Sequence, residues 1–165
     1  MTTRTGRWAA ALSVAAMMGA AAAVQAAEQR PLPAFNVVSL EGVPVSSGQI
    51  GGTGQWLVVY VTPTSPASVR LLSAMKAWES PAMAQRVVVL VGAPLDAAKA
   101  FVAARSQEFP GLRWYADPTN EAWRALRLTG TPYLFGIRDA RIMWSLAGVL
   151  NDPAALESVI RSWLS

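Results

Sequence analysis

The sequence predicts a single α/β domain in which helices cover a mixed β-sheet. Two continuous apolar runs rich in valine, Trp56–Val61 and Arg86–Val91, are typical of strands buried on both faces of a sheet. Between them, Ser65–Glu79 carries apolar residues at helical spacing, so the three segments predict a β-α-β unit with parallel strands. Two further strand patterns and a helix pattern then predict an antiparallel hairpin and a closing helix. A length of 165 residues allows one such domain and not two.

The N-terminus has the pattern of a secretory signal peptide. Arg4 and Arg7 precede the Ala-rich apolar run Trp8–Val24, and Val24-Gln25-Ala26 supplies the small or modest residues that a signal peptidase recognises. We therefore expect residues 1–26 to direct export to the periplasm, with no membrane contact after cleavage. The alternative is an uncleaved anchor that holds the domain on the periplasmic face. It fits less well, because alanine is weakly apolar and the run is near the lower length limit for spanning a bilayer.

The composition excludes several kinds of chemistry. The chain has no cysteine, which removes every thiol mechanism, and no histidine, which removes the commonest general base and metal ligand. The carboxylates are scattered, so we expect neither a metal nor another cofactor. Of the 14 basic residues two lie in residues 1–26, and the remaining 12 are dispersed among 10 acidic residues, a net charge of +2. This balance predicts no nucleic-acid binding. The absence of cysteine and histidine favours a non-enzymatic role.

The part before the β-α-β unit predicts a small antiparallel structure. Residues 27–32 form an extended lead-in, and the domain covers residues 33–165. Two short strand patterns flank a turn that contains an acidic residue and glycine, which together predict a β-hairpin followed by one helical turn. These segments are Phe35–Leu40, Glu41-Gly42, Val43–Val45 and Ser46–Ile50.

The part after the β-α-β unit alternates helix and strand patterns and ends in a helix. The closing helix is marked by Asp152 as its cap and Pro153 in its first turn. Five tryptophans fall at positions that predict core packing: Trp56, Trp78, Trp114, Trp123 and Trp144. The predicted segments are the helices Leu95–Glu108, Thr119–Leu128 and Ala154–Leu164, and the strands Gly111–Ala116, Tyr133–Ile137 and Arg141–Leu146.

Two short motifs indicate a known family. Ser65-Pro66-Ala67-Ser68 opens a helix directly after the first buried strand, and Gly130-Thr131-Pro132 leads into a later apolar run. This pairing resembles the thioredoxin-like superfamily, in particular the periplasmic TlpA and ResA type thiol–disulfide proteins, over roughly residues 33–164. The resemblance implies a three-layer α/β/α fold with a mixed central sheet and a short N-terminal β-hairpin. It also implies a cis peptide bond before Pro132, and it places Ser65 and Ser68 where family members have the two cysteines of Cys-x-x-Cys.

The serines at these positions favour structure over catalysis. A serine nucleophile needs an adjacent base, whereas Ser65 is a good helix N-cap and Pro66 is favoured at the first helical position. Asp117, before Pro118, is expected to cap or turn the chain in the same way.

The resemblance also implies a binding groove, although a role of the Thr-Pro turn in the fold alone is the favoured explanation for its presence. The groove suggests a redox-inactive module that binds a periplasmic protein partner and assists assembly or maturation. The alternative is a thiol–disulfide oxidoreductase or peroxiredoxin-family protein by descent, which the absence of cysteine disfavours. The residues that would line the groove are Thr64, Ser65, Ser68, Thr131, Pro132 and Tyr133.

Overall fold

The computed structural model describes residues 24–25, 29–78, 80, 84–148 and 152–165. The predicted signal peptide, residues 1–26, lies outside this range except for Val24–Gln25, which pair with a strand near the C-terminus. Within the described residues, no helix combines the length and the apolar character needed to cross a bilayer.

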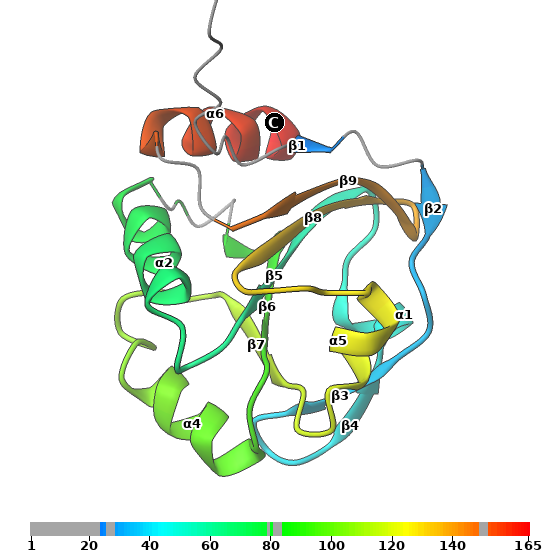
Figure 1. Ribbon diagram of the computed structural model, residues 1–165, viewed down its shortest axis with the longest axis vertical. Coiled ribbons are helices and arrows are strands. Elements are labelled where there is room, and N and C mark those ends of the chain that lie inside the picture. The colour runs from blue at the N-terminus through cyan, green and yellow to red at the C-terminus, as the bar shows by residue number, and fades with distance from the viewer. Residues whose placement is uncertain (1–23, 26–28, 79, 81–83, 149–151) are drawn as a thin grey trace, which may run out of the picture.

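In the part of the chain that the structure describes, nine strands form one mixed sheet in the order β1-β9-β8-β5-β6-β7-β3-β4, with β2 also paired to β9 (Figure 1). The pairs β5–β6 and β6–β7 are parallel and the other pairs are antiparallel. The strands are β1 Val24–Gln25, β2 Arg30–Pro31, β3 Asn36–Ser39, β4 Pro44–Ser46, β5 Gln55–Val61, β6 Val87–Val91, β7 Arg113–Ala116, β8 Tyr133–Arg138 and β9 Arg141–Ala147.

The predicted β-α-β unit and both predicted hairpins are confirmed. β5 and β6 are parallel, with Leu57 opposite Val87, and the helix α2 (Pro66–Trp78) connects them. β3 and β4 pair through Val37 and Val45, and β8 and β9 form the hairpin near the C-terminus. The further helices in the described residues are α1 Ser47–Ile50, α4 Leu95–Ala103, α5 Glu121–Leu126 and α6 Pro153–Leu164.

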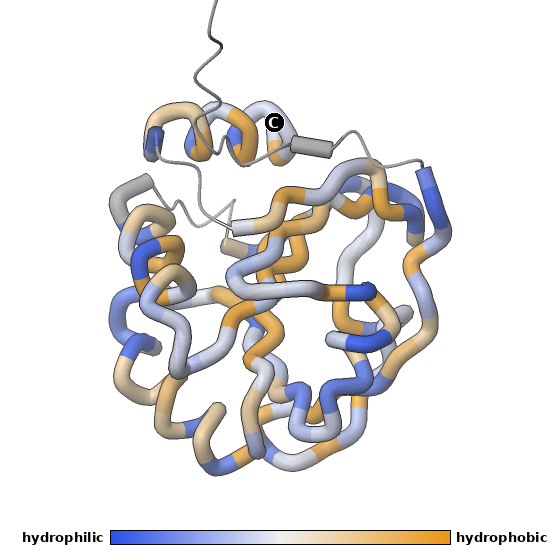
Figure 2. Tube along the Cα trace, viewed as in Figure 1, coloured by the Kyte–Doolittle hydropathy of each residue, from blue (hydrophilic) through white to orange (hydrophobic). Residues whose placement is uncertain are grey.

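Alternation along β5 separates two hydrophobic cores, one on each face of the sheet. Leu57, Val59 and Val61 face the cluster covered by α2, α4 and α6. The intervening Trp56, Val58 and Tyr60 face the cluster covered by α1 and α5. Figure 1 shows α2 and α4 on one side of the central strands and α5 on the other, and Figure 2 shows hydrophobic residues concentrated in β5 and β6. The expected mixed sheet with helices on both faces is therefore correct.

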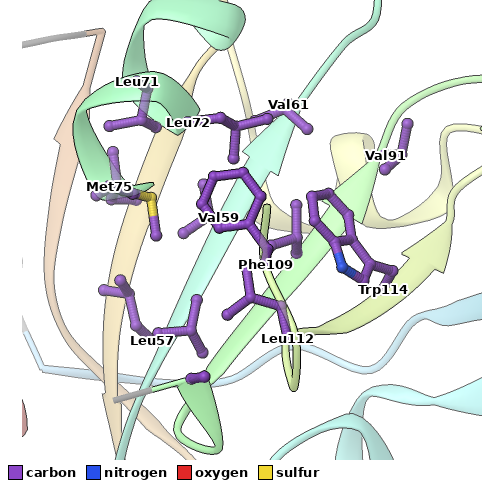
Figure 3. Close-up of a cluster of buried hydrophobic side chains, with 14 of the residues drawn as sticks. Leu57, Val59, Val61, Leu71, Leu72, Met75, Val91, Phe109, Leu112 and Trp114 are labelled. Atoms are coloured by element: carbon purple, nitrogen blue, oxygen red, sulfur yellow. The ribbon is translucent and has the colours of Figure 1, made fainter. Parts of the chain in front are cut away.

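The larger core is filled mainly by α2 and the strands beneath it. Leu72 and Met75 of α2 lie toward Val59 and Val61 of β5 (Figure 3). The rings of Phe109 and Trp114 pack edge to face beside them, with centroids 6.2 Å apart. Trp56 and Trp114 are buried as predicted, but Trp123 and Trp144 are only half-buried, and the side chain of Trp78 lies outside the described part.

Two helices are shorter than the sequence pattern predicts. The expected helix Leu95–Glu108 stops at Ala103, because the following amides bond three residues back instead of four: Arg105 to Val102 and Glu108 to Arg105. The expected helix Thr119–Leu128 contains only α5. Asn120 and Arg127 bound it with left-handed backbone angles, φ 56° and 59°, which an α-helix cannot continue through.

Candidate functional site

Ser65 caps the N-terminus of α2, as predicted. The backbone N–H of Ser68 donates to Ser65 Oγ at 3.3 Å, and Pro66 is the first helical residue. The cap satisfies one of the amides that every helix leaves without a partner in its first turn. Ser65 is half-buried, so its hydroxyl keeps contact with the surface.

Ser68 points inward and acts as a structural acceptor. Its side chain is fully buried, and its Oγ accepts a hydrogen bond from the backbone N–H of Thr62 at 3.2 Å. The hydroxyl therefore joins the first turn of α2 to the end of β5. A buried hydroxyl with this partner is satisfied, and it is not presented to a ligand.

The Thr131–Pro132 peptide bond is cis, as the resemblance implies. The loop that contains it faces the start of α2. Thr131 Oγ1 lies 2.9 Å from Thr62 Oγ1, and the hydroxyl of Ser65 donates to the carbonyl of Thr131 at 3.4 Å. Behind the loop, Gly148 N–H donates to the carbonyl of Pro132 at 2.8 Å, and the Pro132 ring is buried.

These contacts define a hydroxyl network made of Thr62, Ser65, Ser68 and Thr131. Ser65, Ser68 and Thr131 were among the predicted groove residues, whereas Thr62 was not. Its position directly after the buried strand is the sequence feature that could have indicated it. The other predicted groove residues are placed differently. Thr64 is exposed beside the network. The half-buried ring of Tyr133 stacks on Phe135, with centroids 5.0 Å apart and planes at 15°, and packs against the core under α5.

Asp117 lies buried next to α5 and caps it, as predicted. Its carboxylate accepts from the backbone N–H groups of Glu121, Ala122 and Trp123 at 2.8, 3.3 and 3.0 Å. The hydroxyl of Tyr60 donates a fourth bond at 2.8 Å. Burial of the phenol, followed by the nearby charge of Asp117, raises the pKa of Tyr60 well above its usual value. The carboxylate is fully occupied by this structural role.

A surface pocket of about 380 Å³ adjoins the network, with Thr62 common to both. Its other lining residues are Asn120, Trp123 and Arg124. The sequence did not predict these three as site residues. They come close to Thr62 only because α5 is short and has left-handed residues at both ends, and no motif indicates this.

The site offers hydrogen-bonding groups but no thiol or imidazole. The network consists of hydroxyls, and the chain contains neither thiol nor imidazole. Among the described residues, no group of three or more His, Cys, Asp or Glu side chains is arranged to hold a metal ion.

This architecture, with a capped helix after the first parallel strand and a cis Thr-Pro facing it, is that of the thioredoxin-like proteins. The structure superposes on a protein of Chlorobium tepidum assigned as a thiol:disulfide interchange protein DsbE, with TM-score 0.67, 20% identity, and 84% and 99% of the two chains covered. A thio-disulfide isomerase of Thermus thermophilus gives TM-score 0.58, 18% identity, and 81% and 95% coverage.

A thioredoxin family thiol:disulfide interchange protein of Chlorobium tepidum TLS gives TM-score 0.57, 20% identity, and 84% and 99% coverage. No protein-family model and no curated protein matches the sequence. The chain thus has the thioredoxin-like fold of thiol:disulfide interchange proteins and contains no cysteine. It has no thiol with which to perform their exchange reaction.

Proposed function

We propose that this chain is an exported, redox-inactive thioredoxin-like module that binds a protein partner in the periplasm and assists the assembly or maturation of that partner. The observation that carries the proposal is the hydroxyl network, which joins the start of α2 to the Thr131-Pro132 loop with no sulfur present. A surface that is fixed by side-chain hydrogen bonds and carries no thiol is suited to binding another molecule without reacting with it.

The exposed part of the network supplies the means of binding. Ser65, Thr62 and Thr131 are half-buried and Thr64 is exposed, so hydroxyl groups line the surface between helix and loop. Hydroxyls both donate and accept hydrogen bonds, and they can therefore bond to the backbone of a polypeptide laid across them. Proteins of this fold are named for thiol:disulfide interchange, and this chain keeps the binding part of such an activity without the exchange.

The periplasmic location is supported by the sequence alone. Arg4 and Arg7, the apolar run Trp8–Val24 and the small residues that follow have the order of a secretory signal peptide. Detection of a mature N-terminus at residue 27 in a periplasmic fraction tests this part of the proposal, and recovery of the intact chain in the cytoplasm would contradict it.

The binding role is tested by affinity capture. The full chain with a C-terminal tag is expressed in its native host, and proteins that co-purify are identified by mass spectrometry. The variant Thr64→Arg places a long charged side chain on the proposed surface, and Ser158→Arg makes the same change on α6, which contributes no residue to the network. We expect one enriched partner that Thr64→Arg loses and Ser158→Arg retains. Equal capture by both variants would contradict binding at this surface.

A separate assay tests the absence of redox activity. Purified protein is expected to reduce neither insulin nor hydrogen peroxide with dithiothreitol as electron donor, because the chain has no cysteine. Turnover above the rate without protein would overturn the redox-inactive part of the proposal and leave the binding part standing.

A further inference from the structure

We propose that the pocket lined by Thr62, Asn120, Trp123 and Arg124, here called the Arg124 pocket, receives an acidic side chain of the bound partner polypeptide. This inference rests on the proposed binding function and adds the chemistry that the partner must carry. It assigns a role to residues of α5 and its preceding loop that the hydroxyl network does not include.

The volume and the donors of the Arg124 pocket suit a carboxylate. The pocket measures about 380 Å³, which leaves room for an aspartate or glutamate side chain and some water, since one water occupies about 30 Å³ in the liquid. Arg124 Nη1 donates to the carbonyl of Thr119 at 2.9 Å. That bond holds the guanidinium against the loop and uses one of its five N–H groups, so the others can bind a carboxylate.

No acidic group of the protein neutralises Arg124 in the part of the chain that the structure describes. The carboxylate of Asp117 is fully buried and occupied by three α5 amides and Tyr60. Glu121 binds Asn36 instead, through its Oε1, which accepts from the backbone N–H and the side-chain amide of Asn36 at 2.9 and 3.1 Å. The two ion pairs found in this part are Lys76–Glu108 and Arg161–Glu157. A positive charge therefore faces the pocket without an internal partner.

The pocket also adjoins the proposed binding surface, and its Trp123 wall packs against the core. Trp123 packs edge-on against the buried ring of Tyr60, with centroids 5.6 Å apart, which fixes the indole wall. Thr62 belongs to both the pocket and the network, through its contact with Thr131. A polypeptide that crosses Thr62 and Thr131 can thus direct a side chain toward Arg124. This continuity favours a side chain of a docked protein over a separate small acid.

The test is an NMR titration of the isotope-labelled protein with two matched peptides. The probes are acetyl-Ala-Glu-Ala-amide and acetyl-Ala-Gln-Ala-amide, which differ by one carboxylate. We expect the glutamate peptide to shift the Trp123 indole N–H and Asn120 amide signals saturably, and the glutamine peptide to bind at least about tenfold more weakly, as expected for a lost charge-assisted hydrogen bond. Sodium acetate is titrated as a third probe, and it should bind more weakly than the glutamate peptide.

Two variants distinguish binding of the glutamate peptide at the Arg124 pocket from its general electrostatic attraction to a positively charged protein. Arg124→Gln should weaken the glutamate peptide about tenfold, whereas Arg127→Gln removes the same charge from an exposed residue that does not line the pocket and should leave the affinity within about twofold. Equal losses in both variants, equal binding of both peptides, or acetate binding as strong as that of the glutamate peptide would overturn the inference.

The same variants distinguish this inference from the proposed function. If the partner is captured equally well by Arg124→Gln and by the unchanged protein, the pocket inference fails while the binding function stands. If the unchanged protein captures no partner, the binding function fails, and with it the assignment of the pocket to a partner's side chain, even where the peptides bind.

Discussion

The hydroxyl of Tyr60 donates a 2.8 Å hydrogen bond to Oδ2 of Asp117, and both side chains are completely buried. Tyr60 lies on the central strand β5, and Asp117 caps the short helix α5 through three backbone amides. The pair therefore couples the middle of the sheet to the helix that carries Trp123 and Arg124. The stability of α5, and with it the shape of the adjacent pocket, depends on this contact.

Tyr60→Phe removes one donor from the buried carboxylate and keeps the ring. We expect the free energy of unfolding to fall by about 1.5–3 kcal/mol, the usual contribution of a hydrogen bond to a charged group. Urea denaturation at pH 7 measures the change. Tyr115→Phe is the control, since Tyr115 is only half-buried on β7, and it should change the free energy by less than about 0.5 kcal/mol. Similar losses of unfolding free energy in both variants would contradict a specific stabilising contribution of the Tyr60–Asp117 hydrogen bond.

The Tyr60–Asp117 pair also makes the free energy of unfolding depend on pH in the alkaline range. Burial and the charge of Asp117 raise the pKa of Tyr60 above its usual value of 10.0. Above about pH 10 the unfolded chain therefore releases the Tyr60 proton while the folded chain keeps it, so the contribution of Tyr60 to stability is complete below pH 10 and declines as the pH rises. We expect the stability difference between the unchanged protein and Tyr60→Phe to shrink between pH 9 and pH 11. A constant difference over that range would contradict a raised pKa.

Gly136 on β8 leaves room for the indole of Trp144 on β9. A Cβ atom built at position 136 would lie 2.1 Å from Trp144 Nε1, where no real contact occurs. Gly136→Ala should therefore destabilise the hairpin by about 1–3 kcal/mol, the usual cost of overpacking, as measured by thermal or urea unfolding. Gly52→Ala is the matched control, because nothing lies within 4 Å of its Cβ position. If both variants unfold alike, the indole can move aside without cost.

The central part of the fold could be predicted from the sequence because several short-range residue patterns indicate the same elements. The alternating faces of β5 and the cap formed by Ser65 and Pro66 each follow from a few neighbouring residues. The cis bond before Pro132 was expected only through the resemblance to a known family, since X-Pro bonds in general are mostly trans.

The features that were missed depend on contacts between distant segments. α5 is short because Asn120 and Arg127 have left-handed backbone angles. Neither residue is a glycine, so the sequence pattern did not predict these angles. Tyr133, which was expected in the groove by its place after Pro132, is half-buried, and its ring stacks on Phe135 on the same face of β8. The pocket beside Arg124 exists only after α5 packs against β5, so its lining could not be predicted from spacing alone.

The start of α2 should still activate a thiol if one is supplied. In Ser65→Cys the new sulfur replaces the cap at the N-terminus of a 13-residue helix, where free amides and the helix dipole stabilise a thiolate, so its pKa should fall below about 7.5.

Two further single variants serve as controls for this prediction. Ser73→Cys, on an exposed position in the middle of the same helix, should titrate near the ordinary thiol pKa of about 8.5. Ser68→Cys, in place of a fully buried serine, should resist alkylation while the protein is folded. The pH dependence of iodoacetamide alkylation measures all three. The expected order of reactivity at pH 7 is Ser65→Cys, then Ser73→Cys, then Ser68→Cys. If Ser65→Cys and Ser73→Cys titrate alike, the helix end has lost the electrostatic environment that a redox-active protein of this fold requires, and the difference from such proteins extends beyond the two missing sulfur atoms.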